Sequence, residues 1–312
     1  MADIITLTPN PAVDLSTSTE RIVPVMKMRC QAPKRDPGGG GVNVARVVQR
    51  LGGHVEAILP IGGFTGQLLR RLIDDEGVPS RLVDVEAETR EDFAVSELST
   101  AQQYRFVLPG LPLREAEWRA CLDALAASTP PPKFVVGSGS LPPGVPNDFY
   151  AQAAAIARRL GAKFALDTSG APLAAALDLG VYLIKPNLRE MCELAGATLA
   201  GSGDWVAAAR QYITAGKVEV VALSLGHRGA FLVTRDLALH AQPLSIQPVS
   251  AVGAGDSFLG AMIYSLAKCD NLTEAFRLAA AAGAAALIHE GTELCRPADV
   301  YRLSAQVVIA PI

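Results

Sequence analysis

The sequence lacks the features that mark several large classes of protein. Aromatic residues make up only 5% of its 312 residues and the formal net charge is −3, so the chain offers no basic footprint for a nucleic acid. Its five cysteines include no Cys-x-x-Cys pair and its four histidines are dispersed, which indicates neither a disulfide framework nor a zinc site. The N-terminus does not resemble a signal peptide, and no apolar run approaches the roughly 18 residues of a membrane helix. We therefore expect a soluble, cytoplasmic protein without a nucleic-acid or membrane partner.

What the sequence has in abundance is apolar, strand-like segments that alternate with helical ones. Half of its residues are hydrophobic. From residue 115 onward we expect helices at 115–126, 148–160, 172–179, 188–195 and 204–215, and strands at 134–137, 163–167, 182–185 and 219–224. This order predicts an α/β fold whose central sheet is largely parallel and covered by helices on both faces.

The first third of the chain interrupts this rhythm twice. A polar stretch follows a predicted strand at 4–8, and a hairpin follows a strand at 55–61 and a helix at 66–76. The interrupting segments alternate apolar and polar residues at 15–22, 26–32, 93–98 and 104–108. We expect them to form a small β lid, from about 12–36 and 90–108, on a single domain that spans residues 1–312.

A glycine-rich turn opens one strongly apolar helix. Gly253 and Gly255 precede Asp256, and an apolar run follows at 258–266. Glycines let the backbone approach a ligand closely, and the first turn of a helix presents unpaired N–H groups to an anion. Asp256 could then accept the proton of a hydroxyl that attacks a phosphate, or it could simply complement the helix dipole. The turn by itself leaves both interpretations open.

Ligands of parallel sheets bind beyond the carboxyl ends of the strands, and other loops there are rich in glycine or polar residues. They are 38–41, 138–144, 185–187 and 224–226. No Walker motif occurs, and the run from Gly38 ends at Asn43, where a dinucleotide fingerprint has glycine or alanine. These loops predict a ligand site at one edge of the sheet that is neither a Walker site nor a dinucleotide-binding site.

Two further patterns have a structural and a functional interpretation each. Asn187 and Glu190 have the spacing of a capping box, and Glu190 could also hold Mg²⁺ through water. The glycine turn at 224–229 could be a tight hairpin or a bed for a nucleotide. Four cations of the predicted lid could be solvated edge residues or could gather round an anionic substrate. They are Lys27, Arg29, Arg90 and Arg105.

The combination of three motifs resembles the ribokinase-like (PfkB) carbohydrate kinases along the whole chain. The motifs are Pro37 to Asn43, Lys185-Pro186-Asn187 with Glu190, and Gly253 to Asp256. The resemblance implies a central, mostly parallel sheet flanked by helices, with a β lid that also forms the interface of a homodimer. Tyr104 to Val107, Gly139 to Gly144 and Gly291 to Cys295 resemble the sugar-phosphate branch, closest to its minor 6-phosphofructokinases from bacteria.

This resemblance implies ATP-dependent phosphorylation of a ketohexose phosphate. The implied acceptor is the 1-hydroxyl of fructose 6-phosphate, with tagatose 6-phosphate and fructose 1-phosphate as alternatives and a catalytically silent sugar-phosphate sensor as the non-enzyme alternative. Asp256 would match the general base, for which an ordinary ionised carboxylate suffices without a raised pKa. The amides of Gly253, Ala254 and Gly255 would form the anion hole.

The resemblance also assigns ligand contacts to the other loops. It implies sugar-hydroxyl contacts at Asp14, Gly39, Gly40 and Asn43. It implies substrate-phosphate contacts at Arg90, Gly139 and Ser140, with Lys27 and Arg29 from a partner's lid. ATP contacts are implied at Lys185, Asn187, Ser224, Gly226 and Gly229, and a Mg²⁺ water ligand at Glu190.

A monovalent-cation site is implied at the carbonyls of Ser250 and Val252. The loop beside it departs from the pattern of the branch, because His289 and Glu293 stand where asparagine and arginine are expected. Dependence on potassium is therefore left open by the sequence.

Overall fold

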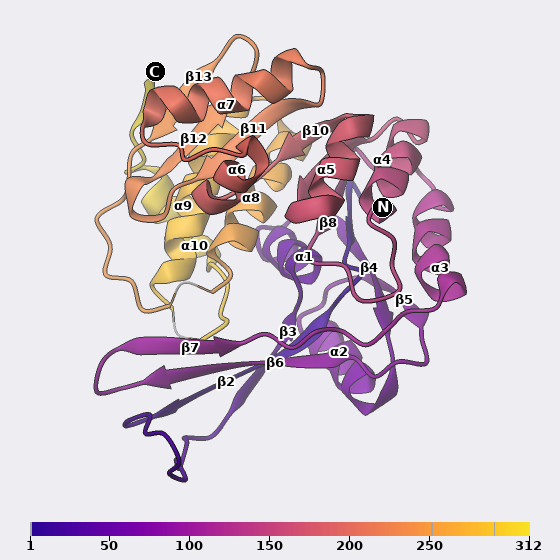
Figure 1. Cartoon of the computed structure of the whole chain (residues 1–312), viewed down its shortest axis with the longest axis vertical. Helices are drawn as coiled ribbons and strands as arrows, with labels where there is room; N and C mark the ends of the chain where they lie inside the picture. The colour runs from indigo at the N-terminus through magenta and orange to yellow at the C-terminus, as the bar shows by residue number, and fades with distance from the viewer. Residues whose placement is uncertain (1, 251, 290) are drawn as a thin grey trace.

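The computed structural model of the chain describes residues 2–250, 252–289 and 291–312. Its body is built on one ten-stranded sheet in the order β14-β13-β12-β11-β10-β9-β8-β1-β4-β5 (Figure 1). Neighbouring strands are parallel from β5 to β11 and antiparallel from β11 to β14. The strands are β1 Ile4–Leu7, β4 Val55–Ile61, β5 Ser80–Asp84, β8 Phe134–Ser138, β9 Lys163–Asp167, β10 Val181–Ile184, β11 Val218–Ser224, β12 Ala230–Val233, β13 Ala238–Ala241 and β14 Ile309–Pro311. The expected α/β class is confirmed.

Helices cover both faces of this sheet, and each face has its own apolar core. One face carries α1 Gly40–Arg50, α2 Gly63–Asp75, α8 Ala254–Lys268, α9 Leu272–Leu287 and α10 Pro297–Ser304. The other carries α3 Glu115–Ala126, α4 Phe149–Arg159, α5 Gly170–Leu179, α6 Leu188–Ala195 and α7 Ser202–Thr214. Successive strand residues enter opposite cores, as Val135 and Val136 do, which explains why these strands are apolar throughout.

A second sheet of four strands stands off the body as the lid (Figure 1). Its order is β3-β2-β6-β7, with β2 and β6 parallel and the outer pairs antiparallel. The strands are β2 Ala12–Thr19, β3 Lys34–Gly38, β6 Arg90–Glu97 and β7 Gln102–Phe106. The predicted hairpin is confirmed as β6 and β7.

One expected lid strand is wrong. The segment 26–32 is not a strand, and β3 pairs with β2 in its place, with Gly38 opposite Ala12. The alternation at 26–32 reflects no buried face, because the side chains of Met26 and Met28 are exposed. β3 leads directly into the glycine turn and α1, so its position is tied to the body.

The predicted helix at 115–126 coincides with α3, and the other predicted elements of the body end within a few residues of the observed ones. Within the described ranges, no helix is both long enough and apolar enough to span a bilayer.

Candidate active site

Asp256 lies in the first turn of α8, where it faces the first turn of α1. Its Oδ2 accepts a hydrogen bond of 2.9 Å from Nδ2 of Asn43. The two helices approach closely because Gly260 has no side chain; a Cβ there would lie 2.8 Å from Val47. Gly253, the residue before α8, has a φ of 74°, a conformation that favours glycine. The N-termini of α1 and α8, each preceded by a glycine-rich turn, therefore meet at the Asp256 carboxylate.

The environment of Asp256 departs from the expectation of an ordinary carboxylate. Burial raises the pKa of Asp256 above its usual value, although the Asn43 hydrogen bond and the charges of Lys185, Arg105 and Arg46 lower it. The implied role of a general base does not require a raised pKa, but in the structure desolvation outweighs the favourable partners and raises it. A raised pKa brings a carboxylate closer to the range useful for a general base.

Lys185 and Asp167 form an ion pair beside this carboxylate. The Nζ of Lys185 lies 3.1 Å from Oδ2 of Asp167, and the lysine side chain is only 6% exposed. A Cβ placed on Gly255 would lie 3.2 Å from the same Nζ, so the lysine reaches the glycine turn. Burial opposes the charge of Lys185, but Asp167 raises its pKa above the usual value, so a cation persists next to the turn. Asp167 was not predicted, although it ends a predicted strand at the ligand-binding edge.

Glycines predicted to contact the sugar hydroxyls and the substrate phosphate come together from distant segments. A Cβ on Gly139 would lie 3.8 Å from the amide nitrogen of Gly40. The carbonyl of Gly139 accepts hydrogen bonds of 2.9 Å from Tyr150 and from Thr168. Nδ2 of Asn10 donates to Oγ of Ser140 at 3.2 Å. The loops that follow β1, β3 and β8 therefore meet at one place.

Three carboxylates lie in one row across the lid. Asp14 of β2 is paired with Asp36 of β3 on one side and with Asp92 of β6 on the other. Burial, and then the charge of Asp92, raises the pKa of Asp14 to about 7, against the opposing charges of nearby arginines. Directly paired residues share a face of the sheet, so this face concentrates negative charge.

Arg90 provides a cation at one end of this row. Its Nη1 donates to Oδ1 of Asp92 at 3.0 Å and to the carbonyl of Leu108 at 2.9 Å, and its Nη2 donates to the carbonyl of Asn10 at 3.2 Å. Its Nε is buried without a hydrogen-bond partner in the described part of the chain. Lys27 and Arg29 lie exposed in the loop between β2 and β3. They stay predictions for a partner's site.

The predicted nucleotide loops lie side by side at the ends of β10 and β11. Oδ1 of Asn187 accepts from the Glu190 amide and Oε2 of Glu190 accepts from the Asn187 amide, both at 2.9 Å, which confirms the capping box. Asn187 also forms a bridge with Ser224. Gly226 opens the short helix η1 Gly226–Arg228 and Gly229 follows it. The roles of these residues toward ATP and Mg²⁺ stay predictions.

The predicted cation loops also lie together. Oγ of Ser250 donates to the carbonyl of Gly291 at 2.7 Å, and the amide of Val252 donates to that Oγ at 3.2 Å. Nε2 of His289 lies 3.1 Å from Asp299, and Glu293 pairs with Arg296. Across the described ranges, no three His, Cys, Asp or Glu side chains are grouped so that they could hold a metal ion.

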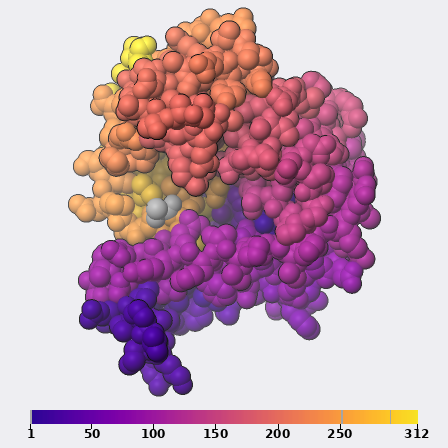
Figure 2. Space-filling view, viewed as in Figure 1, coloured from indigo at the N-terminus to yellow at the C-terminus, as the bar shows by residue number. Residues whose placement is uncertain are grey.

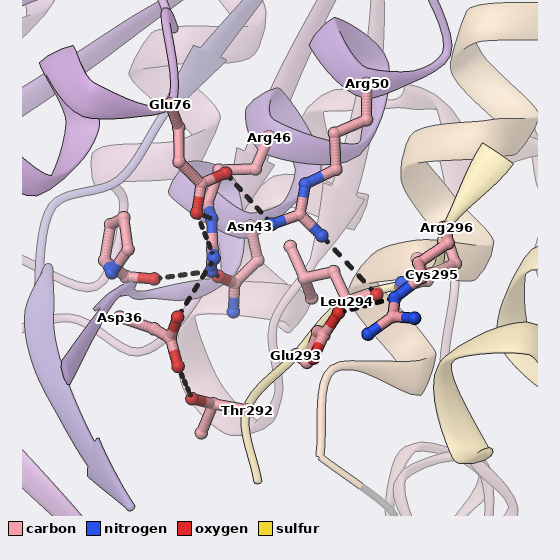
Figure 3. A network of polar contacts seen from close by, with 12 residues as sticks. Asp36, Asn43, Arg46, Arg50, Glu76, Thr292, Glu293, Leu294, Cys295 and Arg296 are labelled. Carbon is pink, nitrogen blue, oxygen red and sulfur yellow. Dashed lines mark hydrogen bonds and ion pairs between the residues drawn. The ribbon is translucent and has the colours of Figure 1, made fainter. Parts of the chain in front are cut away.

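Figure 3 shows a polar network behind Asn43 that the sequence did not suggest. Its centre is Arg46 of α1, whose side chain is completely buried. Arg46 contacts Asn43, Glu76 and Asp36, and Asp36 in turn accepts a hydrogen bond of 2.7 Å from Thr292. No pattern in the sequence marks this arginine, because it lies outside the apolar stripe of α1 formed by Val44, Val47, Val48 and Leu51. The space-filling view shows the molecule hollowed between the lid and the body (Figure 2).

Both the sequence and the fold of the chain are similar to those of known proteins. The family model described as pfkB family carbohydrate kinase matches residues 9–299. The chain is 48% identical over 299 residues to "ATP-dependent 6-phosphofructokinase isozyme 2" of Mycobacterium tuberculosis, which covers 96% of this chain and 88% of that one. It is 34% identical to "1-phosphofructokinase" of Xanthomonas campestris over 313 residues, 99% of this chain and 98% of the other.

Solved structures of phosphofructokinase-2 from Escherichia coli share the fold at 39–40% identity, over 98% of this chain and 99% of theirs. They include a complex with fructose-6-phosphate (TM-score 0.92), a complex with potassium (0.93) and a tetrameric inhibited form (0.92).

Proposed function

The chain belongs to the pfkB family of carbohydrate kinases, and we propose that it transfers the γ-phosphoryl group of ATP to the 1-hydroxyl of fructose 6-phosphate. The observation that carries this proposal is the hydrogen bond that fixes Asp256 at the start of α8, beside the glycine turn and Lys185. Oδ2 of Asp256 accepts the hydrogen bond of Asn43, and we assign Oδ1 as the oxygen that would accept the proton of the attacking hydroxyl.

Positioning and charge neutralisation account for most of the rate in such a reaction. Phosphoryl transfer passes through a loose transition state whose charge is spread over the phosphoryl oxygens. The amides of Gly253, Ala254 and Gly255 would bind these oxygens at the helix start, where the dipole favours an anion. Lys185 adds a positive charge at the same place. Closure of the lid would keep water from ATP.

The choice of acceptor rests on the relatives and on the lid. The relative with 48% identity is a 6-phosphofructokinase and the one with 34% identity a 1-phosphofructokinase, which ranks fructose 6-phosphate above fructose 1-phosphate. Asp14, Asn43 and the glycines at 39 and 40 would hold the sugar hydroxyls. Arg90, with Gly139 and Ser140, would hold the phosphate. Tagatose 6-phosphate is the other alternative.

The nucleotide would lie over the ends of β10 and β11, against Asn187, Ser224, Gly226 and Gly229. Magnesium ions keep several waters and are usually held by one or two carboxylates together with substrate phosphates. The absence of a three-residue cluster among the described residues fits this mode, with Glu190 as the water ligand. A potassium complex of an E. coli relative supports the binding of a monovalent cation, for which we propose the carbonyls of Ser250 and Val252 as ligands.

We further propose a homodimer through the lid in the cytoplasm. The lid exposes apolar side chains, among them Met26 at 67% and Phe106 at 55%. Lys27 and Arg29 are exposed, which leaves them available to a partner's site. All five cysteines are free, which supports a reducing compartment.

Release of ADP with a panel of ketose phosphates tests the proposed reaction. We expect the highest kcat/KM with fructose 6-phosphate and only background with water. A higher kcat/KM with tagatose 6-phosphate or fructose 1-phosphate would select that acceptor. Binding of a ketose phosphate without any ADP release would identify a silent sensor.

A further inference from the structure

The hydrogen bond that orients Asp256 depends on a side chain that does not reach the substrate. We propose that Arg46 is a positioning residue that fixes the direction of the Asn43 amide and thereby keeps Asp256 as a hydrogen-bond acceptor. This inference rests on the proposed role of Asp256 as the general base.

The contacts form a directed chain of two hydrogen bonds. Nη1 of Arg46 donates to Oδ1 of Asn43 at 3.1 Å, and Nδ2 of Asn43 donates to Oδ2 of Asp256 at 2.9 Å. A guanidinium can only donate, and an ionised carboxylate can only accept. The two ends of the chain therefore permit one orientation of the amide between them.

This direction penalises the protonated form of Asp256. A protonated carboxyl could donate a hydrogen bond only if Asn43 turned its oxygen toward it. That rotation would bring Nδ2 against Nη1 of Arg46, two donors without an acceptor, at a buried position. Burial favours the protonated form of Asp256, so the arginine opposes the effect of desolvation.

Arg46 is itself held so that its guanidinium cannot rotate away (Figure 3). Its Nε donates to Oε1 of Glu76 at 2.9 Å, and its Nη1 donates to the carbonyl of Pro37 at 2.8 Å. Its Nη2 also contacts Glu76 and lies 3.7 Å from Oδ1 of Asp36. The lid strand β3, the end of α2 and the amide of Asn43 are thus all held by one buried cation.

Other charged groups act on Asp256 and must be kept constant in a test. Lys185 at the end of β10 and Arg105 of β7 favour its ionised form, together with Arg46 of α1. Asp167 at the end of β9 is a further charged neighbour, since the charge of Asp256 raises the pKa of Asp167. Only Arg46 acts also through the Asn43 amide, so its removal changes both the charge and the direction of the hydrogen bond.

A matched pair of double variants isolates this effect. Removing Arg46 alone would leave the partly buried Glu76 without this cation, so Arg46→Met is combined with Glu76→Gln. The control is Arg50→Met with Glu76→Gln. Arg50 donates to Oε2 of Glu76 at 3.1 Å and to the carbonyl of Leu294 at 3.4 Å, one turn further along the same helix, without contacting Asn43. Both variants lose the same charges.

The first measurement is the pH dependence of kcat/KM, whose acid limb reports the base of the free enzyme. We expect the limb to move upward by about one pH unit or more in the Arg46 variant, as for the loss of a charge and a hydrogen bond, and to stay in place in the control. Arg46→Lys keeps the charge but not the fork of donors, so its acid limb should lie at a pH between those of the Arg46 variant and the control. Equal losses of Tm with no shift of the limb would reduce Arg46 to a structural role and overturn the proposal.

The second measurement does not need turnover. The Asp256 carboxyl can be titrated by ¹³C NMR in protein labelled at aspartate, with Asp256→Asn to assign the signal. A pKa of Asp256 that is higher in the Arg46 variant than in the control, and higher in Arg46→Lys than in the wild type although lysine keeps the charge, supports the proposal. It does so even if no ketose phosphate is phosphorylated, an outcome that would refute only the proposed reaction. An equal pKa in both variants overturns the positioning role whatever the substrate.

Discussion

The body and the lid contribute to the site in opposite ways. In the body, Asp256 is bound by Asn43 and Lys185 by Asp167, so these side chains are in place before any ligand arrives. In the lid, Lys27 and Arg29 are exposed and Arg90 has an Nε without a partner in the described ranges. A prearranged centre suits the transfer of a phosphoryl group, whereas the exposed cations of Lys27 and Arg29 and the Nε–H of the otherwise paired Arg90 suit the capture of an anion. We therefore expect body variants to change kcat and lid variants to change KM for the sugar phosphate.

The largest effect should come from the body, at Asp256. Asp256→Asn removes the proton acceptor but keeps the size of the side chain, so kcat should fall by about 10²-fold or more. Binding of fructose 6-phosphate, measured by calorimetry, should survive because the proposed hydroxyl contacts of Asp14 and Asn43 and the phosphate contact of Arg90 remain. A kcat within a few-fold of the wild type would remove Asp256 from the mechanism.

The corresponding lid variant is Arg90→Ala. We expect KM for the sugar phosphate to rise by about tenfold or more, since a hydrogen bond to a charged group contributes about 1.5–3 kcal/mol. KM for ATP should stay nearly constant, because Arg90 is held by Asp92 and the carbonyls of Leu108 and Asn10, all on the sugar side.

Arg70→Ala serves as the control for Arg90, because its guanidinium is 50% exposed and contacts only Asp84 at 3.9 Å among the recorded ion pairs of the described residues. A rise in KM for ATP, with KM for the sugar unchanged, would place Arg90 on the nucleotide side and break the division between lid and body.

The row of acids in the lid predicts a pH dependence of stability. The pKa of Asp14 is about 7 in the folded chain and 3.8 for the unperturbed side chain. Between these values the unfolded chain releases a proton that the folded chain retains, so stability is highest at low pH and falls as the pH rises toward 7. Asp14→Asn cannot titrate. This linkage amounts to about 3 kcal/mol, so relative to this variant the Tm of the wild type should fall by about 5 °C between pH 4 and pH 7.

Asp84→Asn is the matched control for this titration, since the Asp84 carboxylate is 89% exposed. Its Tm should follow that of the wild type at every pH. A constant difference in Tm between the wild type and Asp14→Asn would show that the row of acids does not hold a proton in the folded lid.

The sequence predicts the body better than the lid, for a physical reason. Strands such as β8 are buried on both faces, so their apolar runs reflect the fold directly, and α3 has the predicted bounds. The lid is covered on few sides, so alternation at 26–32 suggested a strand where Met26 is exposed. β5 was missed because its residues at the edge of the sheet are mostly half-buried and show no clear pattern.

The motifs from which the candidate site was predicted are local, whereas the contacts that the sequence did not suggest are tertiary. Gly253 to Asp256 and the capping box of Asn187 and Glu190 are visible as short motifs. Arg46 reaches Glu76 across 30 positions, and the Lys185–Asp167 pair depends on neighbouring strands. The raised pKa of Asp256 follows from burial, which no motif encodes.

The smallest effect should come from the rim of the body, at Glu190, and it separates two roles that the structure leaves superimposed. Glutamine at this position still completes a capping box, so Glu190→Gln should leave Tm unchanged. It removes the negative charge that would hold a Mg²⁺-bound water. The Mg²⁺ concentration for half-maximal activity should therefore rise by about fivefold, equivalent to about 1 kcal/mol for one hydrogen bond. Glu190→Ala, which removes cap and charge together, should lower Tm as well. An unchanged Mg²⁺ requirement in Glu190→Gln would show that this side chain serves only as a helix cap, because glutamine keeps the cap and loses only the charge.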